Sequence, residues 1–218
     1  MRNLFSPESK FMQGLGTLAD YVFLNLIFLV LCIPVFTIGA AKTAMYRVMF
    51  DLAEDKGNTY KRFFKSFAAE FKAITPLSLL KTAIIALLGY EAYVMSLNQT
   101  DFLGQIVLRS PVIVVLLLTM LIVGMVFSSI PAQVSVFAST RREYLRNGIY
   151  IALTKPGRCL LVAIMDILPV FGLMWNPQFM AAIGPLWFLF YFSVTVNLSM
   201  KLWKKPFDQY IENAEKQK

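Results

Sequence analysis

Long runs of apolar residues, separated by short polar segments, dominate the pattern of this chain. Residues 21–41 carry no charged side chain and lie between Asp20 and Lys42, and residues 110–140 carry none either. A helix needs about 20 mostly apolar residues to cross a hydrocarbon core about 30 Å thick. The pattern therefore predicts membrane-spanning helices rather than a soluble domain.

Five predicted spans account for the apolar runs, at about residues 18–41, 73–97, 110–138, 158–174 and 179–200. The second and fourth are less apolar than the others because they contain ionisable side chains. Residues 175–178 are typical of a tight turn, which predicts a hairpin of the last two spans. The predicted fold class is an all-α membrane protein: a single membrane domain over residues 1–218, built as a bundle of about five transmembrane helices.

Three amphipathic segments accompany these spans, at about residues 59–72, 142–155 and 202–214. The first has an aromatic face that consists of Tyr60, Phe63, Phe64, Phe67 and Phe71. Its basic residues lie mostly on the opposite face and are Arg62, Lys65 and Lys72. Rings at the acyl boundary and cations near the headgroups are typical of a helix lying on a membrane. We expect all three to be elbow helices, meaning short helices along the cytoplasmic surface. The first is also a candidate contact surface for a partner or a neighbouring subunit.

Composition and charge support a membrane protein and orient it. Hydrophobic residues make up 57% of the 218 residues and charged residues 16%, against about 25% charged in soluble domains. The net charge is +8, and most cations follow the first span, the third span and the last span. Because cytoplasmic loops are enriched in Lys and Arg, the N-terminus is predicted outside and the C-terminus in the cytoplasm. The same distribution accounts for the basic charge without a nucleic-acid partner.

Polar side chains within the predicted spans are candidate functional groups, because ionisable groups there are costly. They are Asp166, Lys81, Glu91, Asn25 and Asn197. Asp166 lies deepest, and both Asp166 and Lys81 are expected towards the cytoplasmic half, so a contact between them is an open alternative. Such groups either hold helices together or line a transport pathway, and we favour the first.

Recognisable catalytic patterns are absent from the sequence. The chain has no histidine, and its two cysteines, Cys32 and Cys159, are far apart. It has no Gly-rich phosphate loop followed by Lys and Ser/Thr, and no Gly-x-Ser-x-Gly turn. We therefore expect no enzyme activity, no catalytic residue, no cofactor and no metal site.

Two stretches near the N-terminus carry a distinctive pattern of residues. The first runs from Gly16-x-Leu18-x-Asp20 through Leu24-Asn25 to the segment CIPVFTIGA at 32–40, and the second is FFKSF at 63–67 with Phe71-Lys72. Together they resemble the YesL family of bacterial membrane proteins. The resemblance implies a domain of unknown function whose genes lie beside sugar ABC-transporter components. It therefore implies a role in oligosaccharide uptake at the bacterial plasma membrane, and it supplies no catalytic or ligand-binding residue.

Two functions follow as expectations. The first is a non-catalytic accessory or regulatory subunit of a carbohydrate ABC import system, whose partners would be the lipid bilayer and the permease or ATPase subunits. The alternative is a permease component that itself forms part of a solute pathway. The alternative would require oligomerisation, because five spans are few for a self-contained pathway, and a homo-oligomer is therefore a further candidate partner.

Overall fold

The computed structural model describes residues 10–52, 59–97, 102–175 and 187–216, and single residues between 178 and 185. Every element within these ranges is helical, which confirms the all-α class. In chain order they are α1 (Lys10–Leu31), η1 (Val35–Thr37), α2 (Ile38–Leu52), α3 (Thr59–Leu97), α4 (Phe102–Ser128), α5 (Ile130–Val136), α6 (Arg141–Thr154), α7 (Pro156–Trp175), η2 (Trp187–Tyr191) and α9 (Phe192–Lys216). The element η1 is a 3-10 turn and η2 is a π-helical turn.

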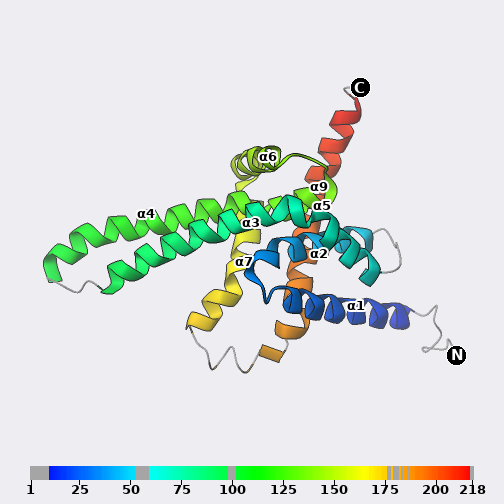
Figure 1. Ribbon diagram of the computed structural model, residues 1–218, viewed down its shortest axis with the longest axis horizontal. Coiled ribbons are helices and arrows are strands. Elements are labelled where there is room, and N and C mark those ends of the chain that lie inside the picture. The colour runs from blue at the N-terminus through cyan, green and yellow to red at the C-terminus, as the bar shows by residue number, and fades with distance from the viewer. Residues whose placement is uncertain are drawn as a thin grey trace.

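The helices do not form a simple parallel bundle. Helices α3 and α4 lie side by side as a long hairpin that extends away from the rest, whereas α7 and α9 run across it (Figure 1). Three described stretches are long and apolar enough to cross a membrane, namely Gly14–Leu31, Thr59–Glu91 and Pro111–Val136. These stretches are compatible with a multi-pass membrane protein.

The first apolar run is broken, contrary to the single span predicted over residues 18–41. Helix α1 ends at Leu31, and the chain turns through Pro34 before α2 begins at Ile38. The Thr37 hydroxyl donates hydrogen bonds to the carbonyl oxygens of Leu31 and of Pro34, the latter at 2.5 Å. The bond to Leu31 satisfies a carbonyl group that the end of α1 leaves without an intrahelical donor, and the bond to Pro34 closes the turn that follows. The segment 32–40 therefore forms a turn between two helices.

The predicted elbow at 59–72 and the predicted span at 73–97 are one continuous helix, α3, with Pro76 inside it. Proline has no N–H, so the carbonyl of Lys72, four residues earlier, loses its helical partner. The guanidinium of Arg141 donates to that oxygen at 2.8 Å. A side chain from α6 thus compensates for the proline, and α3 continues through it.

The other predicted segments agree with the structure in part. The run 110–138 is divided at Ser129 into α4 and α5, with Pro131 near the start of α5, where a missing N–H costs little. The predicted segments 142–155 and 158–174 correspond to α6 and α7. The segment 202–214 is part of α9 rather than a separate elbow. Residues 176 and 177 of the predicted turn at 175–178, and the start of the predicted span at 179, lie outside the described residues.

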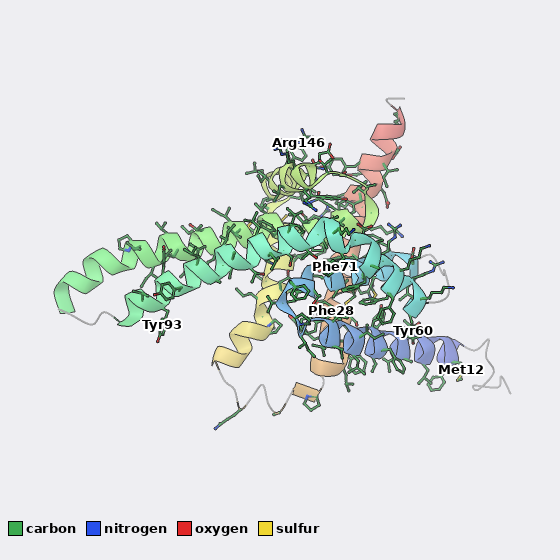
Figure 2. The ribbon with its side chains drawn as sticks, in the orientation of Figure 1. Met12, Phe28, Tyr60, Phe71, Tyr93 and Arg146 are labelled. Atoms are coloured by element: carbon green, nitrogen blue, oxygen red, sulfur yellow. The ribbon has the colours of Figure 1, made fainter. Side chains whose placement is uncertain are left out.

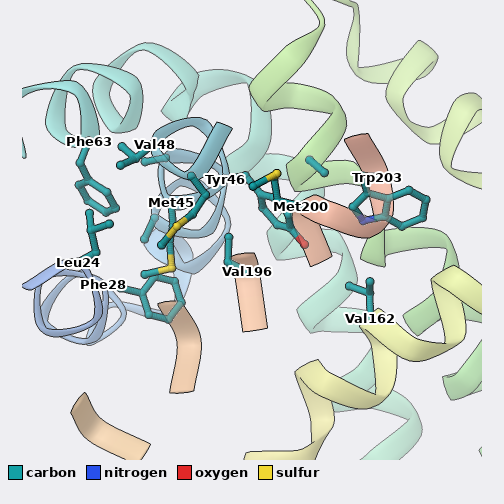
Figure 3. Close-up of a cluster of buried hydrophobic side chains, with 14 of the residues drawn as sticks. Leu24, Phe28, Met45, Tyr46, Val48, Phe63, Val162, Val196, Met200 and Trp203 are labelled. Atoms are coloured by element: carbon teal, nitrogen blue, oxygen red, sulfur yellow. The ribbon is translucent and has the colours of Figure 1, made fainter. Parts of the chain in front are cut away.

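The core surrounds α2, which contributes nine buried residues. Figure 3 shows Leu24 and Phe63 on one side of α2, with Met200 and Trp203 on the other. Tyr46 of α2 lies between these groups and is fully buried. Helix α2 therefore joins α1 and α3 to α9.

Candidate functional site

Three charged side chains from three helices meet in the interior. The ammonium group of Lys42 on α2 donates to Oδ1 of Asp166 on α7, and Nζ of Lys81 on α3 lies 4.0 Å from Oδ2 of the same carboxylate. The sequence singled out Asp166 and Lys81 but left their contact open, and the structure brings them together. We call Lys42, Lys81 and Asp166 the charge cluster.

Lys42 is the member that sequence reasoning missed. It follows the first apolar run directly, where the sequence predicts a cytoplasmic segment rich in cations. The structure places it inside α2, between buried Ala41 and Thr43. The available signal was its position within the segment 38–50, which is mostly apolar on both sides of Lys42. A cation flanked by apolar residues in this way is a candidate for an interior partner.

The helices that carry the cluster approach each other closely because of a glycine. A Cβ placed on Gly39 of α2 would lie 2.5 Å from the Cβ of Ser78 on α3. Small residues at a crossing allow two helix backbones to come together. Gly39 and Ser78 precede Lys42 and Lys81 by three residues each. Because α2 and α3 run in opposite directions (Figure 1), the two lysines lie on opposite sides of this crossing, and both side chains reach Asp166.

The cluster is partly buried and borders a small cavity. The side chains of Lys42, Asp166 and Lys81 retain 16%, 25% and 29% of their accessible surface. The cavity has a volume of about 50 Å³ and is lined by both lysines, Gly39, Ser78 and apolar residues of α2 to α5. Asp166 is not among its lining residues. The cluster therefore has an anionic side on α7 and a cationic side at the cavity.

A second proline compensation holds α7 beside the cluster. Pro169 lies inside α7, so the carbonyl of Met165, next to Asp166, has no helical N–H four residues later. The hydroxyl of Tyr191 donates to that oxygen at 2.6 Å. The π-helical turn η2 ends at this tyrosine. Helix α7 is thereby attached to the start of α9 at the level of Asp166.

The two predicted amides, Asn25 and Asn197, form a seam between α1 and α9. The Asn25 carbonyl oxygen accepts from the backbone N–H of Ser193 at 3.0 Å, just after the π-helical turn has disrupted the regular ladder. The Ser193 hydroxyl donates to the carbonyl of Tyr21 at 2.7 Å, and the Asn197 amide donates to the Tyr21 hydroxyl at 2.5 Å. Through these hydrogen bonds the two asparagines connect α1 to α9, as expected for polar side chains that hold helices together.

The structure does not bring Glu91 to the cluster. Its side chain is exposed on α3, ten residues beyond Lys81, which corresponds to about 15 Å along a helix. Of the five polar residues predicted within spans, two therefore meet at the cluster, two join α1 to α9, and one faces outward.

The predicted aromatic surface of residues 60–72 is largely turned inward. Phe63 is fully buried, and Phe67 and Phe71 are partly buried against the core, whereas Tyr60 and Phe64 are exposed. Figure 2 shows Tyr60 and Phe71 among the side chains of this segment. The reason is that α2 packs along α3 and needs an apolar partner face. Phe63 is therefore not available to a partner.

The cations of that segment differ in their surroundings. Arg62 pairs with Asp51 at 3.1 Å, and Lys65 and Lys72 are exposed. Two open cavities of about 470 and 310 Å³ adjoin here and share Arg47 and Glu70 as lining residues. Arg47 also donates to the carbonyl of Ser135 near the end of α5. These cavities carry both signs of charge, so they define no ligand class.

Helix α6 presents an exposed face of mixed character. Its N-terminus is a capping box, in which Glu143 accepts from the N–H of Thr140 at 2.7 Å. That bond lowers the pKa of Glu143. Tyr144, Gly148 and Ile151 are buried. The opposite, outward face consists of Arg142, Arg146, Ile149, Tyr150 and Leu153. Figure 2 shows Arg146 at the outer edge of the molecule.

The fold and these sites define the class: an all-helical protein with three helices long and apolar enough to cross a membrane, as far as the described residues go. A family model described as "Protein of unknown function, DUF624" matches residues 21–92, about a third of the chain. No curated protein and no solved structure matches the chain. The matched segment includes Asn25, Lys42 and Lys81, but it does not reach Asp166.

Among the described residues, no group of three or more His, Cys, Asp or Glu side chains is arranged to hold a metal ion. The charge cluster itself offers electrostatic chemistry: two ammonium groups, one carboxylate and a small adjoining cavity.

Proposed function

We propose that this protein is a non-catalytic accessory subunit of a carbohydrate ABC import system in the bacterial plasma membrane. In this proposal the chain crosses the membrane five times, with the N-terminus outside and the C-terminus in the cytoplasm. The link to carbohydrate import is supported by the resemblance of residues 16–72 to the YesL family. The orientation is supported by the distribution of Lys and Arg.

The observation that carries the proposal is the outward face of α6. Ile149, Tyr150 and Leu153 expose 50%, 55% and 77% of their surface. They lie opposite the buried side of the helix and next to two exposed cations, Arg142 and Arg146. Tyrosine and arginine are among the residue types that most often dominate the binding energy of protein interfaces.

The arrangement on α6 favours a protein partner over the bilayer surface. In a helix lying on a membrane, apolar and charged residues occupy different faces. On α6 they share one face, with the arginines towards the N-terminal half and Ile149, Tyr150 and Leu153 towards the C-terminal half. This face complements an apolar cleft whose rim carries carboxylates. We therefore assign it to a cytoplasmic surface of an importer subunit.

The test is site-specific photo-crosslinking in intact cells. A photoreactive amino acid replaces Leu153 on the outward face or, as a matched control, the neighbouring Thr154. Thr154 is also exposed, but its side chain projects about 100° away around the helix. Mass spectrometry after gentle-detergent purification then identifies what is attached.

A crosslink from position 153, but not from 154, to a sugar-importer permease or ATPase would support the proposal. Crosslinks from position 153 to phospholipid alone would mean that the face lies on the bilayer, and they would overturn it. The charge-reversing pair Arg142→Glu and Arg146→Glu should reduce recovery of the partner. The matched pair Lys204→Glu and Lys205→Glu, at two exposed cations of α9, should leave recovery unchanged.

A second function, a component of a solute pathway, is favoured by one observation: three charged side chains from different helices meet beside a cavity. The cavity has room for a few water-sized groups but not for a sugar ring. A pathway at this site would therefore need a wider conformation or a second subunit. Sugar flux in proteoliposomes that is abolished by Asp166→Asn would support this function over the first.

A further inference from the structure

Among the described residues that line the cavity beside the charge cluster, the charged ones are both cations. Lys42 and Lys81 border it, while their shared carboxylate, Asp166, lies outside the lining. The remaining lining consists of Ser78, which carries a hydroxyl, of Gly39 and Pro131, and of apolar side chains. A ligand in this cavity would face two ammonium groups at once.

The charges of the cluster do not balance. One carboxylate faces two ammonium groups, which leaves a net charge of +1. Lys42 bonds directly to one carboxylate oxygen, and Lys81 is held 4.0 Å from the other. Lys81 lies in the stretch Thr59–Glu91, which is long and apolar enough to cross a membrane. An uncompensated cation in apolar surroundings is costly, and a bound anion would remove that cost.

The size and lining of the cavity restrict the anion. A volume of about 50 Å³ suits a monatomic ion or a few water-sized groups. A single excess positive charge is matched by a monovalent anion, not by sulfate or a phosphate ester. Apolar walls from Ile38, Leu77 and Phe127 favour an ion that loses its water readily. We propose that Lys42 and Lys81 bind one halide-sized monovalent anion between α2, α3 and the junction of α4 with α5.

This inference is independent of the α6 interface. Binding neutralises the cluster and so stabilises the contact of α2 and α3 with α7. Because the ion binds the folded state, stability should rise with its concentration and then follow the logarithm of concentration above Kd.

The experiment measures thermal unfolding of the full-length protein in lipid nanodiscs by tryptophan fluorescence. Sodium chloride is titrated against sodium gluconate at constant ionic strength, because gluconate is too large for the cavity. At a chloride concentration about ten times Kd, the midpoint should rise by about 3–5 °C. Bromide should reproduce the rise, and sulfate should not. An equal midpoint in chloride, sulfate and gluconate would overturn the proposal.

Lys81→Gln tests the site directly, because it removes one ammonium group and leaves the Lys42–Asp166 pair intact. The chloride-dependent shift should disappear in Lys81→Gln and persist in Lys65→Gln, which replaces an exposed lysine of the same helix away from the cavity. If the shift persists in Lys81→Gln, the proposal is wrong. Should Lys81→Gln fail to fold, bromide anomalous diffraction from the unmodified protein decides: a peak between Lys42 and Lys81 supports the site, and its absence refutes it.

Discussion

The hydroxyl of Tyr191 should stabilise the protein only because Pro169 is present. The hydroxyl donates at 2.6 Å to the carbonyl of Met165, the group that Pro169 deprives of its helical partner. In Tyr191→Phe this carbonyl loses its donor. In the Pro169→Ala background, the substituted alanine supplies a backbone N–H to the same oxygen, so removal of the hydroxyl should matter little.

The expected magnitude follows from two bounds. A buried carbonyl without a donor costs about 1–3 kcal/mol, while hydrogen bonds between membrane helices contribute about 0.6 and at most about 1.7 kcal/mol. Because Met165 and Tyr191 are only partly buried, we expect Tyr191→Phe to cost about 1 kcal/mol in the native background and nearly nothing beside Pro169→Ala. The coupling energy of the two substitutions should therefore be about 1 kcal/mol.

The assay is reversible unfolding in mixtures of a mild detergent and sodium dodecyl sulfate, followed by tryptophan fluorescence, for the four members of the double-mutant cycle. Tyr90→Phe, at an exposed tyrosine of α3, is the control and should be neutral. Other contacts of the Tyr191 hydroxyl are common to both backgrounds and cancel. An equal cost of Tyr191→Phe in both backgrounds would refute the reasoning.

Three further predictions concern other parts of the fold. Gly39→Ala should destabilise by about 1–2 kcal/mol in the same unfolding assay, because its methyl would lie 2.5 Å from Ser78, whereas Gly16→Ala has free space and should be neutral or stabilising. Tyr144→Phe should cost about 1–3 kcal/mol, because its buried hydroxyl donates to one backbone carbonyl at 2.6 Å and accepts one N–H at 3.0 Å; an unchanged unfolding midpoint would contradict this. The Glu143 carboxylate should keep its hydrogen bond to the Thr140 N–H at pH values above the ordinary glutamate pKa of about 4.3, and lose it as the pH falls through the lowered pKa of Glu143. The measurement is the pH dependence of the amide chemical shift of residue 140, which should be absent in Glu143→Gln.

The sequence alone identifies part of the charge cluster. Asp166 and Lys81 stand out because charged side chains are rare in apolar runs, and this rarity depends on the sequence only. The contact between Asp166 and Lys81, and the bond of Lys42 to the same carboxylate, form only because the folded chain brings α2, α3 and α7 together. The crossing of α2 with α3 is set by Gly39 against Ser78, and no periodicity along the chain encodes which helix lies opposite.

The same distinction explains the aromatic segment at 59–72. The helical spacing of its rings predicted an amphipathic helix, and the structure has a helix there. The spacing cannot distinguish an apolar face that contacts lipid from one that packs against protein, because lipid tails and a protein core are both apolar. Packing against α1 and α2 decided it, and Phe63 became part of the core.

The sequence by itself determined that this is an all-helical protein with helices fit to cross a membrane, because that property depends on the length and apolar content of local runs. The tertiary structure decided where those runs break or continue. Pro34 and Thr37 end α1 early, whereas Arg141 and Tyr191 allow α3 and α7 to continue through Pro76 and Pro169. A proline removes one N–H wherever it stands, and whether its orphaned carbonyl finds another donor depends on side chains that only the folded chain brings near.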